Sequence, residues 1–162
     1  MRIGEHRLRE HLRLLMPCMG LVSLVWLLRA IMDAAGSPPW IVRMTSVTLA
    51  TSVALLLAVV LIHVRQFGGY PSVVTAAFLL NLWSELLICL AIVFSVVTGI
   101  VNIYTAPEYT PLALDPYHLK HLRGHLTFGV GLGTLVGSAV GSLLLFLLRM
   151  LAPMRKPPSS WK

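Results

Sequence analysis

Four long apolar stretches separated by turn residues occupy most of this chain of 162 residues. They cover about residues 17–35, 41–64, 73–104 and 116–151, and a helix of roughly 20 apolar residues is enough to cross a bilayer. In hydrocarbon, backbone amide and carbonyl groups must bond within their own segment, which selects helices. The sequence therefore predicts an all-α integral membrane protein with four transmembrane helices packed as a bundle.

The composition leaves no room for a separate soluble catalytic domain. Hydrophobic residues make up 57% of the chain and charged residues 12%, whereas a soluble domain carries about 25% charged residues. The sequence contains no phosphate-binding glycine loop, nucleophile elbow, HExxH or CxxC motif. Cys18 and Cys89 each lie inside an apolar stretch, where we expect free thiols. We expect a protein that is not an enzyme.

The basic residues predict the topology. Nine of the 13 lysines and arginines fall on the side of the two termini and of the loop after the second span, against four on the other side. Under the positive-inside rule both termini are cytoplasmic, in a cell inner (plasma) membrane. The basic clusters flank apolar stretches, so they favour anionic lipid headgroups as partners and exclude nucleic acid.

The two ends of the chain are expected to lie outside the bilayer. Residues 1–16 place Leu8, Leu12 and Leu15 at helical spacing between arginines, which is typical of a short amphipathic interfacial helix. Pro17 is expected to end that helix. The four-helix domain then covers residues 17–151, with an extramembrane start to the fourth helix, and residues 152–162 form a cytoplasmic tail.

The fourth apolar stretch carries glycines four residues apart: Gly129, Gly133, Gly137 and Gly141. This spacing places them on one helix face and forms a smooth groove of the glycine-zipper kind. The groove favours close packing against another helix, either within this chain or in a partner subunit. A flat cofactor such as haem or a chlorin pigment, or a quinone, is the alternative occupant.

Three histidines open the fourth helix at positions 118, 121 and 125. His118, His121 and His125 are expected to point within about 60° of one another on its first two turns. They are candidate ligands for a haem, chlorin or quinone, or for a divalent metal with Glu108 or Asp115. An ordinary interfacial role explains the same residues. We expect His125 to be the deepest and the best single ligand.

The third stretch carries polar side chains inside its apolar sequence: Asn81, Ser84 and Glu85 share one helix face. An ionisable residue inside lipid is costly and marks a functional candidate. Glu85 could relay protons, bind a cation, or be held by a basic side chain such as Arg65 or Arg149. We expect it in the cytoplasmic half of the bundle, away from the histidine cluster.

The junction between the last two spans is similar to that of small four-helix membrane proteins of the cytochrome b type. Val97-Thr98-Gly99 ends one span, and a loop and a histidine lead into the next. The resemblance covers only these residues, and spans one and three lack the internal histidines that such proteins use to bind haem.

Three functional hypotheses follow from the sequence. The first is a small non-catalytic subunit of a larger membrane complex, such as a respiratory or photosynthetic electron-transfer complex, which packs against other subunits through its glycine-rich fourth helix. The second is a membrane redox protein that binds haem, pigment or quinone at the histidine cluster. The third is a small proton- or ion-coupled transporter centred on Glu85.

Overall fold

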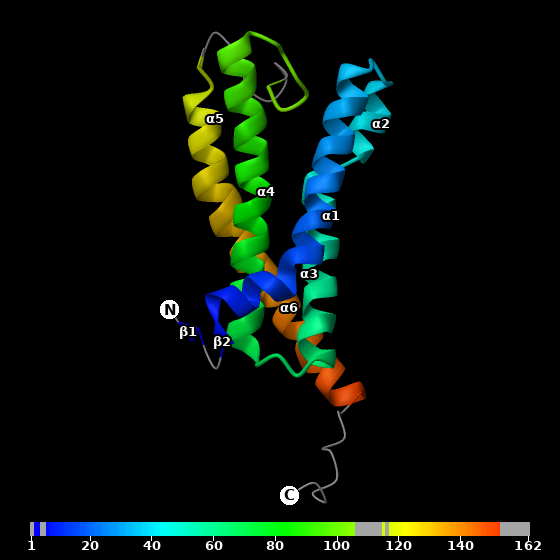
Figure 1. Ribbon diagram of the computed structural model, residues 1–162, viewed down its shortest axis with the longest axis vertical. Coiled ribbons are helices and arrows are strands. Elements are labelled where there is room, and N and C mark those ends of the chain that lie inside the picture. The colour runs from blue at the N-terminus through cyan, green and yellow to red at the C-terminus, as the bar shows by residue number, and fades with distance from the viewer. Residues whose placement is uncertain (1, 4–5, 106–114, 116, 153–162) are drawn as a thin grey trace, which may run out of the picture.

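The computed structural model describes residues 2–3, 6–105, 115 and 117–152, and these form an almost entirely helical protein (Figure 1). Four helical units are long and apolar enough to cross a membrane, which is what a multi-pass membrane protein requires. The elements are β1 (Arg2–Ile3), β2 (His6–Arg7), α1 (Leu8–Ala34), α2 (Pro39–Met44), α3 (Val47–Val64), α4 (Tyr70–Thr98), α5 (Leu119–Gly124), the π-helix η1 (His125–Gly129) and α6 (Val130–Leu151). Helices α5, η1 and α6 form one continuous unit.

The N-terminal segment differs from the predicted separate interfacial helix. β1 and β2 pair as short antiparallel strands, and α1 then runs without interruption from Leu8 through Pro17. Figure 1 shows that α1 bends, with its first turns across the other helices and the remainder along them. Proline inside a helix removes one hydrogen bond and kinks the axis, so Pro17 bends α1 instead of ending it. The ring of His6 stacks on Phe67, with the two ring centroids 3.8 Å apart.

The long helices pack in pairs. α4 packs on the α6 unit, α1 packs on α3, and α3 contacts both α4 and α6. In Figure 1 the two pairs diverge towards the end at which α2 lies, here called the α2 end. The opposite end, where β1 and β2 lie, is called the β1–β2 end. The segment after α4 returns between α1 and α4 at the α2 end.

Local signals set where α3 and α4 begin and end. The Ser46 hydroxyl accepts a hydrogen bond from the Leu49 amide (3.3 Å) and caps α3. Gly99, at φ +73°, ends α4 with its amide donating to the Ser95 carbonyl. The third helix therefore stops at Thr98, whereas the apolar sequence predicts a helix up to Tyr104. A left-handed glycine ends a helix even where hydropathy continues.

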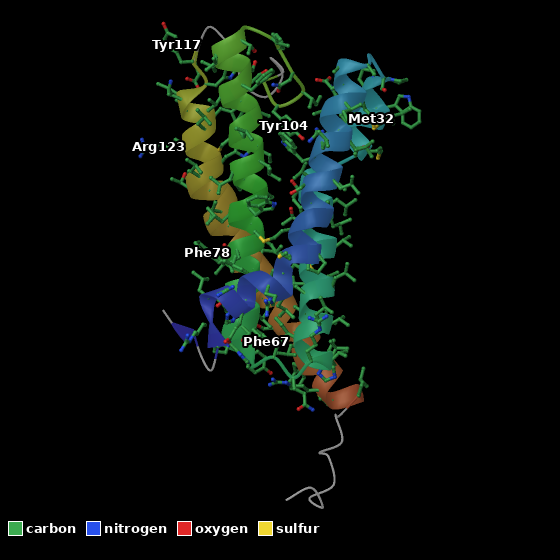
Figure 2. The ribbon with its side chains drawn as sticks, viewed as in Figure 1. Met32, Phe67, Phe78, Tyr104, Tyr117 and Arg123 are labelled. Carbon is green, nitrogen blue, oxygen red and sulfur yellow. The ribbon has the colours of Figure 1, made fainter. Side chains whose placement is uncertain are left out.

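The core consists of small and branched side chains between the helices. Ala54, Ala58 and Ala77 are fully buried, which lets the backbones approach closely. Large apolar side chains cover the outside of every long helix, and Phe78 in Figure 2 is one of them. An apolar exterior around a small-residue core is the arrangement that a lipid solvent favours.

The glycine face of the fourth unit is filled by this chain. A Cβ atom on Gly141 would lie 2.8 Å from Val73 and 3.2 Å from Val59, and one on Gly137 would lie 2.8 Å from Leu55. Gly129 and Gly133 face α4 in the same way. In this structure all four glycines thus pack against α3 and α4.

We expect Gly141→Ala to lower the free energy of unfolding by about 1–3 kcal/mol, the usual cost of overpacking a filled core. The reason is that Val73 and Val59 are fully buried and would have to shift to admit the added methyl group. Gly131→Ala is the matched control, because nothing lies within 4 Å of its Cβ position. Reversible unfolding in mixed micelles measures both variants. Equal stability would contradict this packing.

Candidate functional site

Glu85 and His125 form the central contact of the candidate site. His125 Nδ1 lies 2.5 Å from Glu85 Oε2, joining α4 to the π-helix η1. Both side chains are largely buried. Where the Glu85 carboxylate is ionised it can only accept a hydrogen bond, and Nδ1 of His125 is then the donor.

A second imidazole extends this contact. His125 Nε2 lies 3.0 Å from His121 Nε2, with ring centroids 4.8 Å apart. In that tautomer a neutral His125 accepts at Nε2, and Nε2–H of His121 is the donor. Glu85, His125 and His121 therefore form a continuous hydrogen-bonded chain, here called the relay.

The relay depends on a glycine. A Cβ atom on Gly129 would lie 2.6 Å from the carboxyl carbon of Glu85, so only glycine leaves room for the carboxylate. The same residues, His125–Gly129, form the π-helix, which has a wider turn than an α-helix. Turns of this kind occur often at functional sites. The spacing of apolar residues in the sequence does not indicate this π-helix.

Asn81 and Ser84 lie beside Glu85 but play different parts. Asn81 Nδ2 donates to the Ala77 carbonyl (2.8 Å), and its Oδ1 lies against Gly133. Ser84 Oγ donates to the Asn81 carbonyl (2.9 Å) and is buried in α4. Asn81 thus faces the fourth helix next to Glu85, while Ser84 is satisfied within its own helix.

His118 does not share the helix face of the other two histidines. It precedes α5 in a left-handed conformation (φ +52°), and its ring centroid lies 6.2 Å from that of His121. The helix starts later than predicted because the Asp115 carboxylate accepts from the backbone amides of Leu119 (2.9 Å) and His121 (3.1 Å). Asp115 therefore caps the helix, as an acidic residue at this end should. Glu108 and Pro116 lie outside the described residues.

A cavity of about 380 Å³ adjoins the relay at the α2 end. Every long helix contributes to it, and so does the segment after α4. Its polar lining consists of two guanidinium groups, two imidazoles, a phenol and two hydroxyls, and its lining residues are Arg29, Arg43, Ser46, Thr48, Ile88, Ile103, Tyr104, His121 and His125. It is called the basic cavity below.

Several polar atoms of the basic cavity lack an internal partner. Among the described residues, no hydrogen-bond partner reaches the buried atoms Arg29 Nε, Tyr104 Oη and His121 Nδ1. Buried polar groups are normally paired. Burial raises the pKa of Tyr104 to about 12, so its hydroxyl keeps the proton and can donate. Arg29 Nε–H and Tyr104 Oη–H are therefore donors without an internal partner beside the cavity, and His121 Nδ1 is an acceptor when His121 Nε2 carries the proton.

The segment after α4 forms one wall of the basic cavity. Figure 2 places Tyr104 between α4 and α1. The Ile103 amide donates to Asp33 Oδ2 (2.7 Å), and the Arg29 guanidinium lies 5.1 Å from the centroid of the Tyr104 ring. Arg29 and Asp33, one turn apart on α1, hold this wall in place.

The structure brings together two groups that the sequence analysis separates. We expected Glu85 and the histidine cluster in opposite halves of the bundle, and that expectation is wrong, because Glu85 contacts His125 directly. Glu85 lies about 20 Å from Thr98 along α4, near the middle of the helix. Tyr104 and Arg29 also belong to the site, although the sequence pattern predicted neither of them as a ligand-binding residue. Arg29 is a charged residue near the end of an apolar span, and such a residue marks a functional candidate.

Haem ligation fits this arrangement poorly. Both ring nitrogens of His125 already make hydrogen bonds, to Glu85 and to His121. Within the described part of the chain, His, Cys, Asp and Glu side chains form no group of three that could hold a metal ion. An axial bond from His125 to iron would have to replace one of these two hydrogen bonds.

Comparison with protein families, with curated proteins and with solved structures gives no match. The site is therefore interpreted from its own geometry. Fold and site together define a helical multi-pass membrane protein with a buried carboxylate–imidazole pair beside a basic cavity.

We expect Glu85→Leu to move the proton of neutral His125 away from Nδ1, because the leucine side chain offers no acceptor. Glu85→Gln should keep it there, since the amide oxygen can accept the same hydrogen bond. The ¹⁵N chemical shifts of the histidine ring, recorded in lipid nanodiscs, distinguish the two tautomers. Identical His125 shifts in the two variants would show that Glu85 does not orient this ring.

Proposed function

We propose that the protein carries small organic carboxylates across a membrane together with a proton, and that the basic cavity is its binding site. One observation carries the proposal: a carboxylate–imidazole–imidazole relay ends in a cavity that Arg29 lines. This develops the hypothesis of a proton-coupled transporter centred on Glu85. The relay adds His121 and His125 to Glu85 as groups that can carry the proton.

The charge of the basic cavity favours an anion. Its described lining includes the guanidinium group of Arg29, whose Nε has no hydrogen-bond partner among the described residues, and no carboxylate. A guanidinium group matches a carboxylate in shape and can bond both oxygens. Ile88 and Ile103 give the cavity an apolar wall for a short carbon skeleton. These features support a small organic acid as the ligand.

The relay can move one proton between the ligand and Glu85. A bound carboxylic acid gives its proton to His121 Nδ1, while His121 Nε2–H passes to His125 Nε2 and His125 Nδ1–H passes to Glu85. The ligand loses one proton and becomes a carboxylate beside Arg29, and Glu85 gains one proton and becomes neutral. The reverse sequence returns the proton. Hydrogen-bond lengths of 2.5 and 3.0 Å support such transfer.

The orientation remains part of the proposal. The excess of arginine and lysine near the chain ends supports a cytoplasmic β1–β2 end in a cell inner membrane. The basic cavity then opens in the outer half of the bundle. Membrane lipids surround the apolar exterior.

The subunit hypothesis loses its main support. It used the glycine groove of the fourth helix as the surface for a partner subunit, but α3 and α4 of the same chain fill that groove. Membership of a larger complex is therefore a weaker proposal. Purification in mild detergent tests it, because an obligate subunit copurifies with other chains.

A quinone is the second candidate ligand, and one observation favours it. A larger cleft of about 770 Å³, mostly apolar, lies between α1 and α4, and Tyr104 lines both this cleft and the basic cavity. A quinone head in the cavity and an isoprenoid tail in the cleft would use both spaces. We expect lipid extracts of the purified protein to contain no stoichiometric quinone. Stoichiometric quinone on chromatography would favour this alternative over the carboxylate.

We expect Arg29→Gln to weaken lactate binding by about tenfold or more, the usual effect of removing a charged hydrogen-bond donor. Lactate serves as the probe because it crosses lipid slowly. Arg123→Gln is the matched control, since Arg123 is exposed on α5 and points away from the other helices (Figure 2). Calorimetry on the purified protein measures binding, and thermal unfolding checks both variants.

Transport is measured with the protein in liposomes that contain a pH-sensitive dye. An inward lactate gradient should acidify the interior as labelled lactate enters, and Glu85→Gln should abolish both signals. Lactate entry without acidification would contradict the proton coupling. Absence of both binding and entry in the unmodified protein would overturn the proposed function.

A further inference from the structure

Tyr104 is the most deeply buried polar residue of the basic cavity. Its side chain is 6% exposed, less than that of any other polar residue in the lining. Its hydroxyl has no hydrogen-bond partner among the described residues. A buried hydroxyl without a partner costs free energy, and a ligand that accepts its hydrogen bond removes that cost.

Hydrogen bonds to α4 fix the backbone on both sides of Tyr104. The Tyr104 amide donates to Asn102 Oδ1 (2.9 Å), and Asn102 Nδ2 donates to the Ala91 carbonyl of α4 (2.9 Å). The hydroxyl groups of Thr105 and Ser95 lie 3.0 Å apart. The phenol is therefore held in place before a ligand arrives, and a group held in this way loses little entropy on binding.

The guanidinium group of Arg29 lies beside this phenol. Its central carbon is 5.1 Å from the centroid of the Tyr104 ring. Burial raises the pKa of Tyr104, and the nearby charge of Arg29 partly opposes that rise, so the two polar groups act on the same space. A carboxylate that bonds Arg29 with both oxygens thus brings the atoms on its carbon 2 close to Tyr104.

We infer that Tyr104 selects acids with an oxygen on carbon 2, the 2-hydroxy and 2-oxo acids, by donating its hydroxyl hydrogen to that oxygen while Arg29 holds the carboxylate. This inference rests on the proposed function and narrows its substrate class. A hydroxyl or carbonyl oxygen accepts the bond, whereas an acid with only hydrogen there leaves the buried donor unpaired. A site built around such a bond rejects the analogue that lacks it.

The remaining lining fits the same class of acid. Ile103 precedes Tyr104 in the chain and lines the cavity with Ile88, which leaves an apolar wall for the carbon skeleton. An oxygen on carbon 2 also adds a polar group that must leave water when the acid enters lipid. Acids of this class therefore cross a bilayer slowly without a carrier.

Three acids of three carbons and one carboxylate each test the inference. The unmodified protein should bind lactate and pyruvate about tenfold or more tighter than propionate, which has no oxygen on carbon 2. Tyr104→Phe should weaken lactate and pyruvate binding by about tenfold and leave propionate binding within about twofold. The reason is that phenylalanine removes the donor and keeps a ring against Arg29. Calorimetry on the purified protein measures all three affinities.

Tyr117→Phe is the matched control. Tyr117 is 67% exposed, lies on the outside of the molecule in Figure 2 and does not line the basic cavity, so this variant should keep the full preference for lactate over propionate. Arg29→Gln should weaken all three acids alike, because Arg29 binds the carboxylate that they share. If Tyr104→Phe also weakens all three alike, Tyr104 acts through Arg29 or through packing, and the selection is overturned. Thermal unfolding shows that each variant is folded.

The outcomes separate this inference from the proposed function. If the unmodified protein binds and transports lactate and propionate equally well, the role of Tyr104 is overturned and the carrier function stands. If it binds and transports none of the three acids, the proposed function itself fails. A preference that Tyr104→Phe loses and Tyr117→Phe keeps supports the selection.

Discussion

The hydrogen bond between Glu85 and His125 is the interaction on which the rest of the structure depends. A carboxylate in the middle of an apolar helix is expensive unless a partner satisfies it. His125 can reach it only because Gly129 has no side chain and the helix widens there into a π-turn. The packing of α6 on α4 and the chemistry of the site therefore arise from the same few residues.

The α2 end and the β1–β2 end of the protein differ in the side chains that lie between the helices. At the α2 end, polar side chains and the segment after α4 surround the basic cavity. Towards the β1–β2 end, small and branched apolar side chains fill the space between α3, α4 and α6. One end therefore has room for a polar ligand, while the other is filled by apolar side chains. This asymmetry is compatible with the proposed carrier function.

Hydropathy predicted much of the fold, and polar residues inside apolar stretches pointed to part of the site. The four spans, Glu85 and His125 could all be found because lipid makes charged and polar groups conspicuous. The pairing of Glu85 with His125 could not be found, because it depends on how deeply two distant helices overlap. Tyr104 was hidden for a related reason: a left-handed glycine ends α4 early and turns the chain back inward.

The π-turn at residues 125–129 determines what the loss of one residue would do to this helix. A turn of this type accommodates one residue more than the α-helical path around it. A chain lacking one residue there could run as an unbroken α-helix, and Gly133, Gly137 and Gly141 would still meet their neighbours. The imidazole at its start would rotate away from the acid. The extra residue thus places the imidazole beside the acid, and a chain shortened by it would keep the architecture while losing the contact between His125 and Glu85.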